Sequence, residues 1–303
     1  MKRKLVKQGA ATLMVSLPSK WIKENKLEKG SEINLEEVEN GLMIMPEVSE
    51  KKSEVTIALS NSAESTINSL IDTSYRLGYD RINVSFTTEN QFKTVNKIIK
   101  DRLIGMEITK KDKNSCIIEN VTEPSLDQYD NILRKMFLDI DALFEITKAK
   151  LENSQNQEIE NFEEIEDRIN KYNSFCRRVI TKSTLSKKKF GLTWTILVLI
   201  HHAQRDIYNI HKYKYLESKI KGSEKTLNLL KMTREMNKLV QKAIYEKNIS
   251  LVEEIHKLGK EIYKEGSGLL EKSKGKEIMI ILHLISASRQ FYFTNAPLFG
   301  LII

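Results

Sequence analysis

The sequence contains few of the residues that interrupt regular structure. Only 4 prolines and 12 glycines occur among 303 residues, so long uninterrupted helices are expected. Hydrophobic residues make up 40% of the chain and charged residues 30%, which is typical of folded helical proteins and excludes general disorder. A chain of this length is expected to form two or three domains.

Cysteine is also scarce, since Cys116 and Cys176 are the two in the chain. They lie in different segments and form no CxxC pair, which excludes a disulfide-rich scaffold and a paired-cysteine zinc site. One disulfide between them is an open alternative. The simpler interpretation is a protein whose thiols stay reduced in the cytosol.

Long hydrophobic runs are absent as well. The longest are Phe190–Ile200 and Ile278–Leu282, the second continuing past His283 to Ala287, and both are near 11 residues. A membrane-spanning helix needs about 20, so both runs are predicted to be buried helices. The basic start of the chain has no apolar stretch behind it of the kind found in signal peptides. We therefore expect a cytoplasmic protein without membrane insertion.

The sequence has no motif that indicates catalysis. It has no P-loop, dinucleotide fingerprint, HExxH pair or nucleophile–base pattern. The glycines at 259, 266 and 268 fall within a helical pattern and do not follow a strand. We expect no enzyme activity, no cofactor and no catalytic residue.

Charge is unevenly distributed along the first fifty residues, although the whole chain carries a net charge of +8. Residues 1–23 carry six basic side chains and no acid, namely Lys2, Arg3, Lys4, Lys7, Lys20 and Lys23. Residues 24–50 have a local charge of −6. The six basic residues are predicted to contact the DNA phosphate backbone. The alternative is a solvated strand edge on which lysines prevent edge-to-edge pairing.

Residues 1–47 are predicted to form a β-β-α-β-β unit. Strands are expected over 2–7 and 12–17, and then around Ile33–Leu35 and Leu42–Met45, on either side of the hairpin turn at Asn40-Gly41. Pro18 is expected in the first turn of a short helix that Lys29-Gly30 ends. A unit this small buries little core by itself, so we expect it to dimerise.

This segment resembles the SpoVT-AbrB family, in the version found at the start of archaeal phosphate-uptake-regulator-like proteins. The likeness lies in four stretches: Lys7–Gly9, Leu13–Pro18 with Lys20-Trp21, Leu27–Ile33 and Gly41–Ile44. The resemblance implies a barrel of hairpins swapped between two chains. It also implies that basic residues on one face of this homodimer bind DNA.

Residues 53–122 alternate strand and helix patterns in the order β-α-β-α-β-β, which indicates a small α/β module. From Pro124 onward the chain is predicted to be helical, giving a domain over 125–303. Six helices are expected, over 126–152, 161–183, 188–215, 223–247, 249–272 and 275–296. The predicted fold class is therefore multi-domain α+β with an all-α C-terminal half.

The third and sixth of these helices share an apolar start and a tyrosine-containing end, which indicates two three-helix repeats. Residues 125–296 resemble the PhoU family of paired three-helix bundles, most clearly at His202–Ile207. At the positions of that family's metal-binding Glu-x-x-x-Asp motif, this chain has Tyr208 and Lys212, and then Tyr292 and Ala296. Tyrosine is a poor ligand for hard cations and Lys212 would repel one, so no metal ligands are predicted.

Other polar and aromatic groups have unspecific patterns. His201 and His202 are adjacent and point about 100° apart on a helix, so core or surface histidines are expected rather than metal ligands. The acids of helices 126–152 and 161–183 are expected on solvated faces, with a hard-cation site as the open alternative. Five aromatic residues are expected in a core or interface: Phe190, Trp194, Phe291, Tyr292 and Phe293.

Three functions are compatible with these patterns. The leading hypothesis is a DNA-binding transcriptional regulator linked to phosphate uptake or phosphate signalling. The main alternative is an adaptor that docks on a phosphate-transport ATPase or sensor protein, with the N-terminal unit serving to dimerise. A third is the DNA-binding antitoxin of a toxin pair, which the long ordered helical half argues against.

Overall fold

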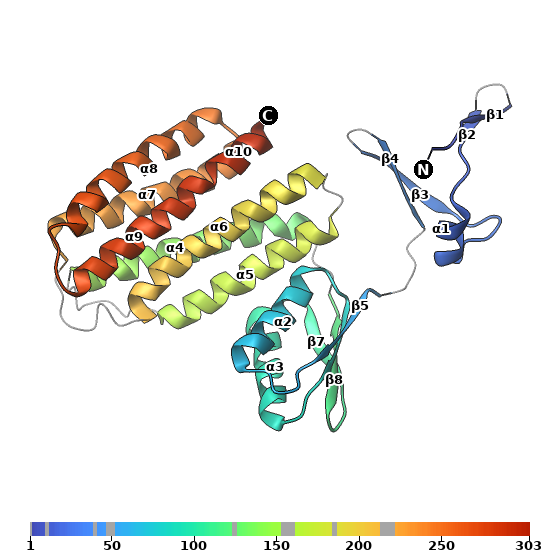
Figure 1. Ribbon diagram of the computed structural model, residues 1–303, viewed down its shortest axis with the longest axis horizontal. Coiled ribbons are helices and arrows are strands. Elements are labelled where there is room, and N and C mark those ends of the chain that lie inside the picture. Colours follow the sequence, from blue (N-terminus) through green and yellow to red (C-terminus); the bar gives the residue numbers. More distant parts are fainter. Residues whose placement is uncertain are drawn as a thin grey trace. The chain divides into compact units, whose positions relative to one another are not determined.

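The chain folds into two compact units, residues 1–52 and residues 53–303 (Figure 1). In this computed structural model the described residues are 2–9, 12–38, 41–46, 52–122, 126–152, 161–183, 187–212 and 222–303. The predicted α/β module and helical domain lie together in the second unit. Residues 47–51 of the charged segment that links the two units lie outside the described residues. So do Ala10 and Ala11, between the first two predicted strands, and Asn40 of the predicted hairpin turn.

The first unit has the predicted β-β-α-β-β order. Its elements are β1 (Val6–Gln8), β2 (Thr12–Met14), α1 (Ser19–Glu24), β3 (Ile33–Val38) and β4 (Gly41–Pro46). In the described residues β1 pairs with β2 and β3 pairs with β4, both antiparallel, as two separate two-stranded sheets. The first strand begins at Val6 rather than at Lys2, because β2 ends at Met14 and offers residues 2–5 no ladder partner.

Helix α1 is shorter than predicted and starts one residue later. Pro18 is its N-cap rather than a residue of its first turn, and the Pro18 carbonyl accepts the first helical hydrogen bond, from Ile22. The helix ends at Glu24, well before Gly30, because Lys26 adopts a left-handed φ of 52°. The Trp21 carbonyl accepts from the Asn25 backbone N–H at 3.1 Å and from the Asn25 side-chain amide at 2.8 Å, so Asn25 adds a second hydrogen bond at the end of the helix.

The α/β module has the predicted order of elements. These are β5 (Glu54–Ala58), α2 (Glu64–Arg76), β6 (Arg81–Ser85), α3 (Glu89–Arg102), β7 (Met106–Lys111) and β8 (Ser115–Asn120). The strands form one sheet in the order β5-β6-β8-β7, in which only β5 and β6 are parallel. Alternate side chains such as Ile82 and Val84 are buried beneath α2 and α3, so both helices cover one face of the sheet (Figure 1).

In its described residues, the helical part contains one more helix than the sequence predicts. The elements are α4 (Leu126–Leu151), α5 (Phe162–Lys182), α6 (Lys187–Lys212), α7 (Glu224–Glu246), α8 (Ile249–Leu270), α9 (Lys276–Phe293) and α10 (Asn295–Ile302). The predicted helix over 275–296 is in fact divided at Thr294. Pro297 has no N–H to continue the hydrogen-bond ladder past Phe293, and both the amide and the hydroxyl of Thr294 donate to the Phe291 carbonyl.

The long helices pack in two groups, α4 with α5 and α6, and α7 with α8 and α9. The groups meet mainly where α6 lies beside α9 (Figure 1). The two longest apolar runs lie on these helices, and Leu197, Ile200, Ile281 and Leu284 are buried in a single hydrophobic core, as predicted. None of the helices described in the structure is long and apolar enough to span a membrane.

A polar joint connects the α/β module to the bundle, where α2 and α3 pack on α5. Arg178 of α5 is completely buried, and its guanidinium donates to the carbonyl oxygens of Tyr75 and Tyr79 at 3.1 and 2.9 Å and to Asp80 at 3.2 Å. The Asp80 carboxylate also accepts from Lys182. A charge buried this deeply needs several partners to offset its loss of hydration, so the joint has a specific geometry.

Candidate nucleic-acid interface

The six basic residues predicted to contact DNA are all exposed. Lys2, Arg3 and Lys4 precede the first strand in an extended segment, and Lys7 lies within β1. Lys20 and Lys23 lie three residues apart on α1 and so share one side of that helix. In the described part of the unit the one ion pair of these residues joins Lys20 to Glu24, at 3.8 Å on a highly exposed surface, and such a pair stabilises little.

Apart from Glu24, which ends α1 and pairs with Lys20, the acidic residues of the unit occupy different elements from this basic group. Glu28 and Glu32 are exposed in the segment between α1 and β3, and Glu37 is exposed in β3. The basic residues therefore belong to the first hairpin and α1, and the acids mainly to the second hairpin and the segment before it. This separation leaves the basic elements free to attract a polyanion, because no carboxylate on the same hairpin neutralises them.

The second hairpin has an uncovered apolar face. Leu35 lies opposite Ile44, and Leu42 lies opposite Glu37 in the same register. Because side chains alternate along a strand, Leu35, Leu42 and Ile44 project from the same face. Leu35 is 62% exposed and Leu42 is 65% exposed. A single copy of the unit therefore leaves these leucines in water.

The first hairpin is equally uncovered. Val6 lies opposite Met14, and Lys7 lies opposite Leu13. The side chains of Leu5, Val6 and Leu13 are all more than half exposed. None of the described residues between 2 and 46 is buried, although globular units normally bury their larger apolar side chains. One copy of this unit lacks a core, and its apolar strand faces need a partner surface.

Comparison with known proteins identifies this unit alone. A family model described as antidote-toxin recognition MazE, bacterial antitoxin, matches residues 6–52. No curated protein and no solved structure matches the chain. The N-terminal unit is therefore a MazE/AbrB-like domain, in agreement with its predicted SpoVT-AbrB resemblance. Beyond the α/β module, the described residues from 126 onward are largely helical.

Four of the five histidines, all but His202, are engaged in pairwise hydrogen bonds. His211 is buried beside the hydroxyl of Thr147 at 2.8 Å, and burial lowers its pKa to about 3. The His201 ring nitrogen lies 2.8 Å from Asn170 Oδ1, and burial holds its pKa well below the usual value. Within the described ranges, no three His, Cys, Asp or Glu side chains are grouped as a metal site would require.

Several helix acids form ion pairs between elements rather than lying on solvated faces as predicted. Asp141 of α4 binds Arg234 of α7 through two contacts of 2.6 Å, and hydrogen bonds from Arg234 lower the pKa of that carboxyl. Asp139 binds Arg168 at 2.8 Å. These pairs join neighbouring helices, which periodicity alone does not reveal. The side chain of Asp127, another acid of this group, lies outside the described residues.

The aromatic residues divide between core and surface. Phe291 is fully buried, as predicted, whereas Phe293 is 44% exposed. Phe190 and Trp194 contact each other with ring centres 5.7 Å apart. Both cysteines are buried and free, so no disulfide joins them. Burial raises the pKa of the Cys116 thiol to about 11.

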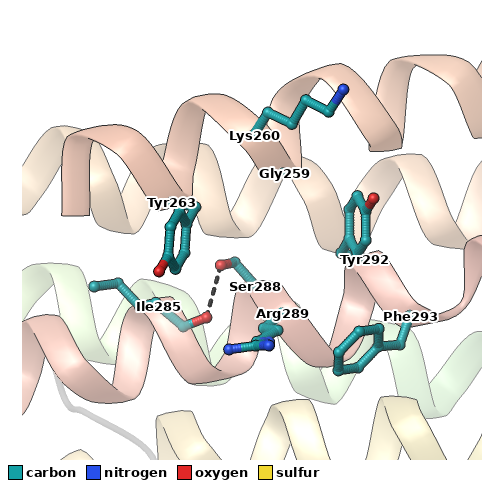
Figure 2. Close-up of a pocket in the computed structure, with 8 residues that line it drawn as sticks. All are labelled: Gly259, Lys260, Tyr263, Ile285, Ser288, Arg289, Tyr292 and Phe293. Carbon is teal, nitrogen blue, oxygen red and sulfur yellow. Dashed lines mark hydrogen bonds between the residues drawn. The ribbon is translucent and has the colours of Figure 1, made fainter. Parts of the chain in front are cut away.

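Sequence reasoning missed one cavity, between α8 and α9 (Figure 2). Its volume is about 450 Å³. Eight residues line it: Gly259, Lys260, Tyr263, Ile285, Ser288, Arg289, Tyr292 and Phe293. The sequence signal that could have indicated it is Gly259, because a glycine within a helical pattern often marks the close approach of another group.

Proposed function

We propose that this protein is a DNA-binding transcriptional regulator that dimerises through its N-terminal unit. The observation that carries the proposal is the combination of an exposed basic group with uncovered apolar strand faces in one unit, whose residues 6–52 match the MazE family model. Apolar faces account for the dimer, and basic residues account for phosphate contact. A dimer presents both copies of the basic group, that is, twelve cations.

The dimer is proposed to form by pairing of the apolar hairpin faces of two chains, in the swapped arrangement that the AbrB resemblance implies. Burying Leu35, Leu42 and their neighbours would give the small unit the core that a single copy lacks. Homodimers close this kind of interface by presenting the same surface twice. The protein is proposed to have no catalytic activity.

The proposed signal is phosphate availability, and its support is the PhoU resemblance of residues 125–296 alone. In this proposal the α/β module and the bundle receive the signal, and a population shift in their arrangement changes how the two DNA-binding units are presented. The regulator would act in the cytoplasm.

A salt titration of the full-length protein on duplex DNA tests the function. For each phosphate contact, the slope of log K against log salt steepens by about 0.9. Replacing Lys2, Arg3, Lys4 and Lys7 with Gln is expected to flatten this slope and weaken binding at every salt concentration. The matched control replaces four exposed lysines of α7, Lys225, Lys231, Lys238 and Lys242, and removes the same charge from the second unit.

Both quadruple variants must remain dimeric by sedimentation, so that a loss of binding is not a loss of assembly. The proposal is refuted if the two variants bind DNA equally well, or if the unmodified dimer binds no more tightly than the variant that lacks Lys2, Arg3, Lys4 and Lys7. A stable dimer without DNA affinity would favour the second candidate. That candidate is an adaptor docking on a phosphate-transport ATPase or sensor protein.

A third candidate, a toxin-neutralising antitoxin, is favoured by the description of the matched family. Residues 53–303 form one compact unit with its own core, unlike a short tail that folds on a partner. A toxin gene adjacent in the genome, together with rescue of cells from that toxin by this chain, would favour the antitoxin over the regulator.

A further inference from the structure

The cavity between α8 and α9 is bounded by aromatic rings at two ends (Figure 2). Tyr263 extends from α8 toward α9, and Tyr292 extends from α9 toward α8, with Ser288 between them. The volume of about 450 Å³ is within the range of small-molecule sites, which is about 300–1,000 Å³. The gap between the rings therefore has the size and the walls of a site for a flat apolar group.

Tyr292 is held in place by contacts with α8. Its hydroxyl lies 3.0 Å from Nδ1 of His256. Its ring packs so closely on Gly259 that a Cβ at that position would lie 2.6 Å from the ring. One wall of the cavity is thus fixed before any ligand arrives, which reduces the entropy lost on binding.

The cavity also has one available positive charge. The guanidinium carbon of Arg289 lies 5.6 Å from the centre of the Phe293 ring, and within the described residues Arg289 has no carboxylate partner. The eight lining residues include no acid. The ammonium of the other lining cation, Lys260, points away from the gap (Figure 2). A ligand would therefore meet a single guanidinium beside apolar walls.

The Tyr263 side chain supplies a second unused polar group. It is 57% exposed, and no described residue forms a hydrogen bond with its hydroxyl. Ser288, by contrast, already donates its hydroxyl proton to the Ile285 carbonyl at 2.9 Å. A guanidinium and a phenol together match a carboxylate, which accepts hydrogen bonds through both oxygens.

We propose that this cavity binds a small aromatic carboxylate, with the ring between Tyr263 and Tyr292 and the carboxylate on Arg289. Free phosphate fits less well, because it carries no apolar group and would meet only one inward-facing cation. Whether the cavity binds this ligand does not depend on the proposed DNA binding. A role of the ligand as an effector of DNA binding rests on the proposed function.

Ligand-observed NMR with 3-phenylpropionate and the full-length protein tests the site. A ligand of this size is expected to bind with a dissociation constant on the order of 0.1–1 mM. Its neutral analogue, 3-phenylpropanamide, is expected to bind about tenfold more weakly, because the charge-assisted contact with Arg289 is lost. This comparison changes the ligand and leaves the protein unaltered.

Two variants locate the binding. Arg289→Gln is expected to remove the preference for the acid over the amide. The control, Lys257→Gln, removes an exposed charge of α8 outside the cavity and is expected to retain this preference. Tyr263→Ala is expected to weaken both ligands. Because Tyr263 is an exposed side chain, the variant is expected to stay folded, and thermal melting checks this. Equal binding of acid and amide to the unmodified protein overturns the proposal.

Two other outcomes also overturn it. In the first, inorganic phosphate binds in the same range and 3-phenylpropionate does not. In the second, neither probe binds, and Tyr263→Ala changes how the sedimentation of the protein depends on its concentration. That result would show that this face is a contact between copies of the chain. None of these experiments measures DNA binding, so their failure leaves the proposed regulator function unaffected.

Discussion

Leu35 gives the sharpest test of the proposed dimer, because it is a large apolar side chain that a single copy leaves 62% exposed. In a monomer, Leu35→Gln would cost almost nothing, since the side chain is already mostly in water. In the proposed dimer the same side chain lies in the interface. A monomer therefore predicts almost no effect of Leu35→Gln, whereas the proposed dimer predicts weaker association of the two chains.

Fully burying a leucine contributes about 1.5–3 kcal/mol. Covering the exposed 62% of Leu35 would then contribute about 1.5 kcal/mol per chain. A symmetric dimer covers two copies, so Leu35→Gln is expected to cost about 3 kcal/mol, or about a hundredfold in the dimer dissociation constant. Sedimentation equilibrium over a wide concentration range measures this constant directly.

The matched control is Leu138→Gln on α4, where the leucine is 67% exposed in the second unit. It removes a similar exposed apolar area, and it is expected to leave the dissociation constant within threefold of the unmodified value. If the two variants dissociate at the same concentration as the unmodified protein, the β3–β4 face takes no part in the dimer. The reasoning from uncovered apolar area would then be wrong.

Three further predictions concern the second unit. Gly266→Ala is expected to destabilise the protein by about 1–3 kcal/mol in urea unfolding, because its Cβ would lie 2.5 Å from the Ile285 side chain. A Cβ at Gly268 would have no neighbour within 4 Å, so Gly268→Ala is expected to stabilise the protein by about 0.5–1 kcal/mol. Equal effects of the two substitutions on the free energy of unfolding would contradict the packing of Gly266 on Ile285. Cys116 and Cys176 are expected to resist iodoacetamide at pH 8 until unfolding, because burial raises both thiol pKa values, and rapid labelling of the native protein would disprove this. In the folded protein His211 is protonated only near its pKa of about 3, whereas in the unfolded chain a histidine is protonated near pH 6.5. The free energy of unfolding is therefore expected to fall as the pH drops below 6.5, by up to about 1.4 kcal/mol per pH unit. The His211→Gln variant should lack this contribution to the pH dependence.

The local elements of the fold were predictable because their signals are local. The α/β module follows from alternating strand and helix patterns whose breaks are marked by Gly78 and Gly105, and both glycines adopt positive φ. The end of α1 was missed because Lys26, not a glycine, takes the left-handed conformation there. The division before α10 was missed because Thr294 is neither a glycine nor a proline, and because the helix that follows it continues across Pro297.

The interfaces were not predictable, because they depend on contacts between residues far apart in the sequence. The basic group of the candidate DNA interface is visible as charge, yet the exposure of Leu35 and Leu42 required coordinates. The cavity needs Tyr263 and Tyr292 to face each other across two helices. Periodicity places each residue on a helix face but does not say which helix lies opposite.

The polar joint at Arg178 leads to the last prediction. Asp80, which accepts from Arg178 and Lys182, also accepts from the amide and hydroxyl of Ser53 at 3.1 and 2.9 Å. Ser53 is the first residue of the second unit. A single network thus connects α5 of the bundle to the point where the chain enters from the N-terminal unit.

Arg178→Met would remove the buried charge and the hydrogen bonds that its guanidinium donates to the carbonyl oxygens of Tyr75 and Tyr79. Removing one partner of a buried charged network costs about 3–5 kcal/mol. We expect amide hydrogen exchange to accelerate in β5 and at Ser53, while α7 and α8, which do not contact the joint, keep their protection. Lys182→Met is the control. Lys182 is 30% exposed whereas Arg178 is fully buried, so replacing Lys182 should accelerate exchange less.

Uniform acceleration over all helices would mean that Arg178 stabilises the whole unit rather than the joint. Unchanged exchange at Ser53 would mean that the network does not hold the entry point of the chain, and a signal from the bundle would then need another route.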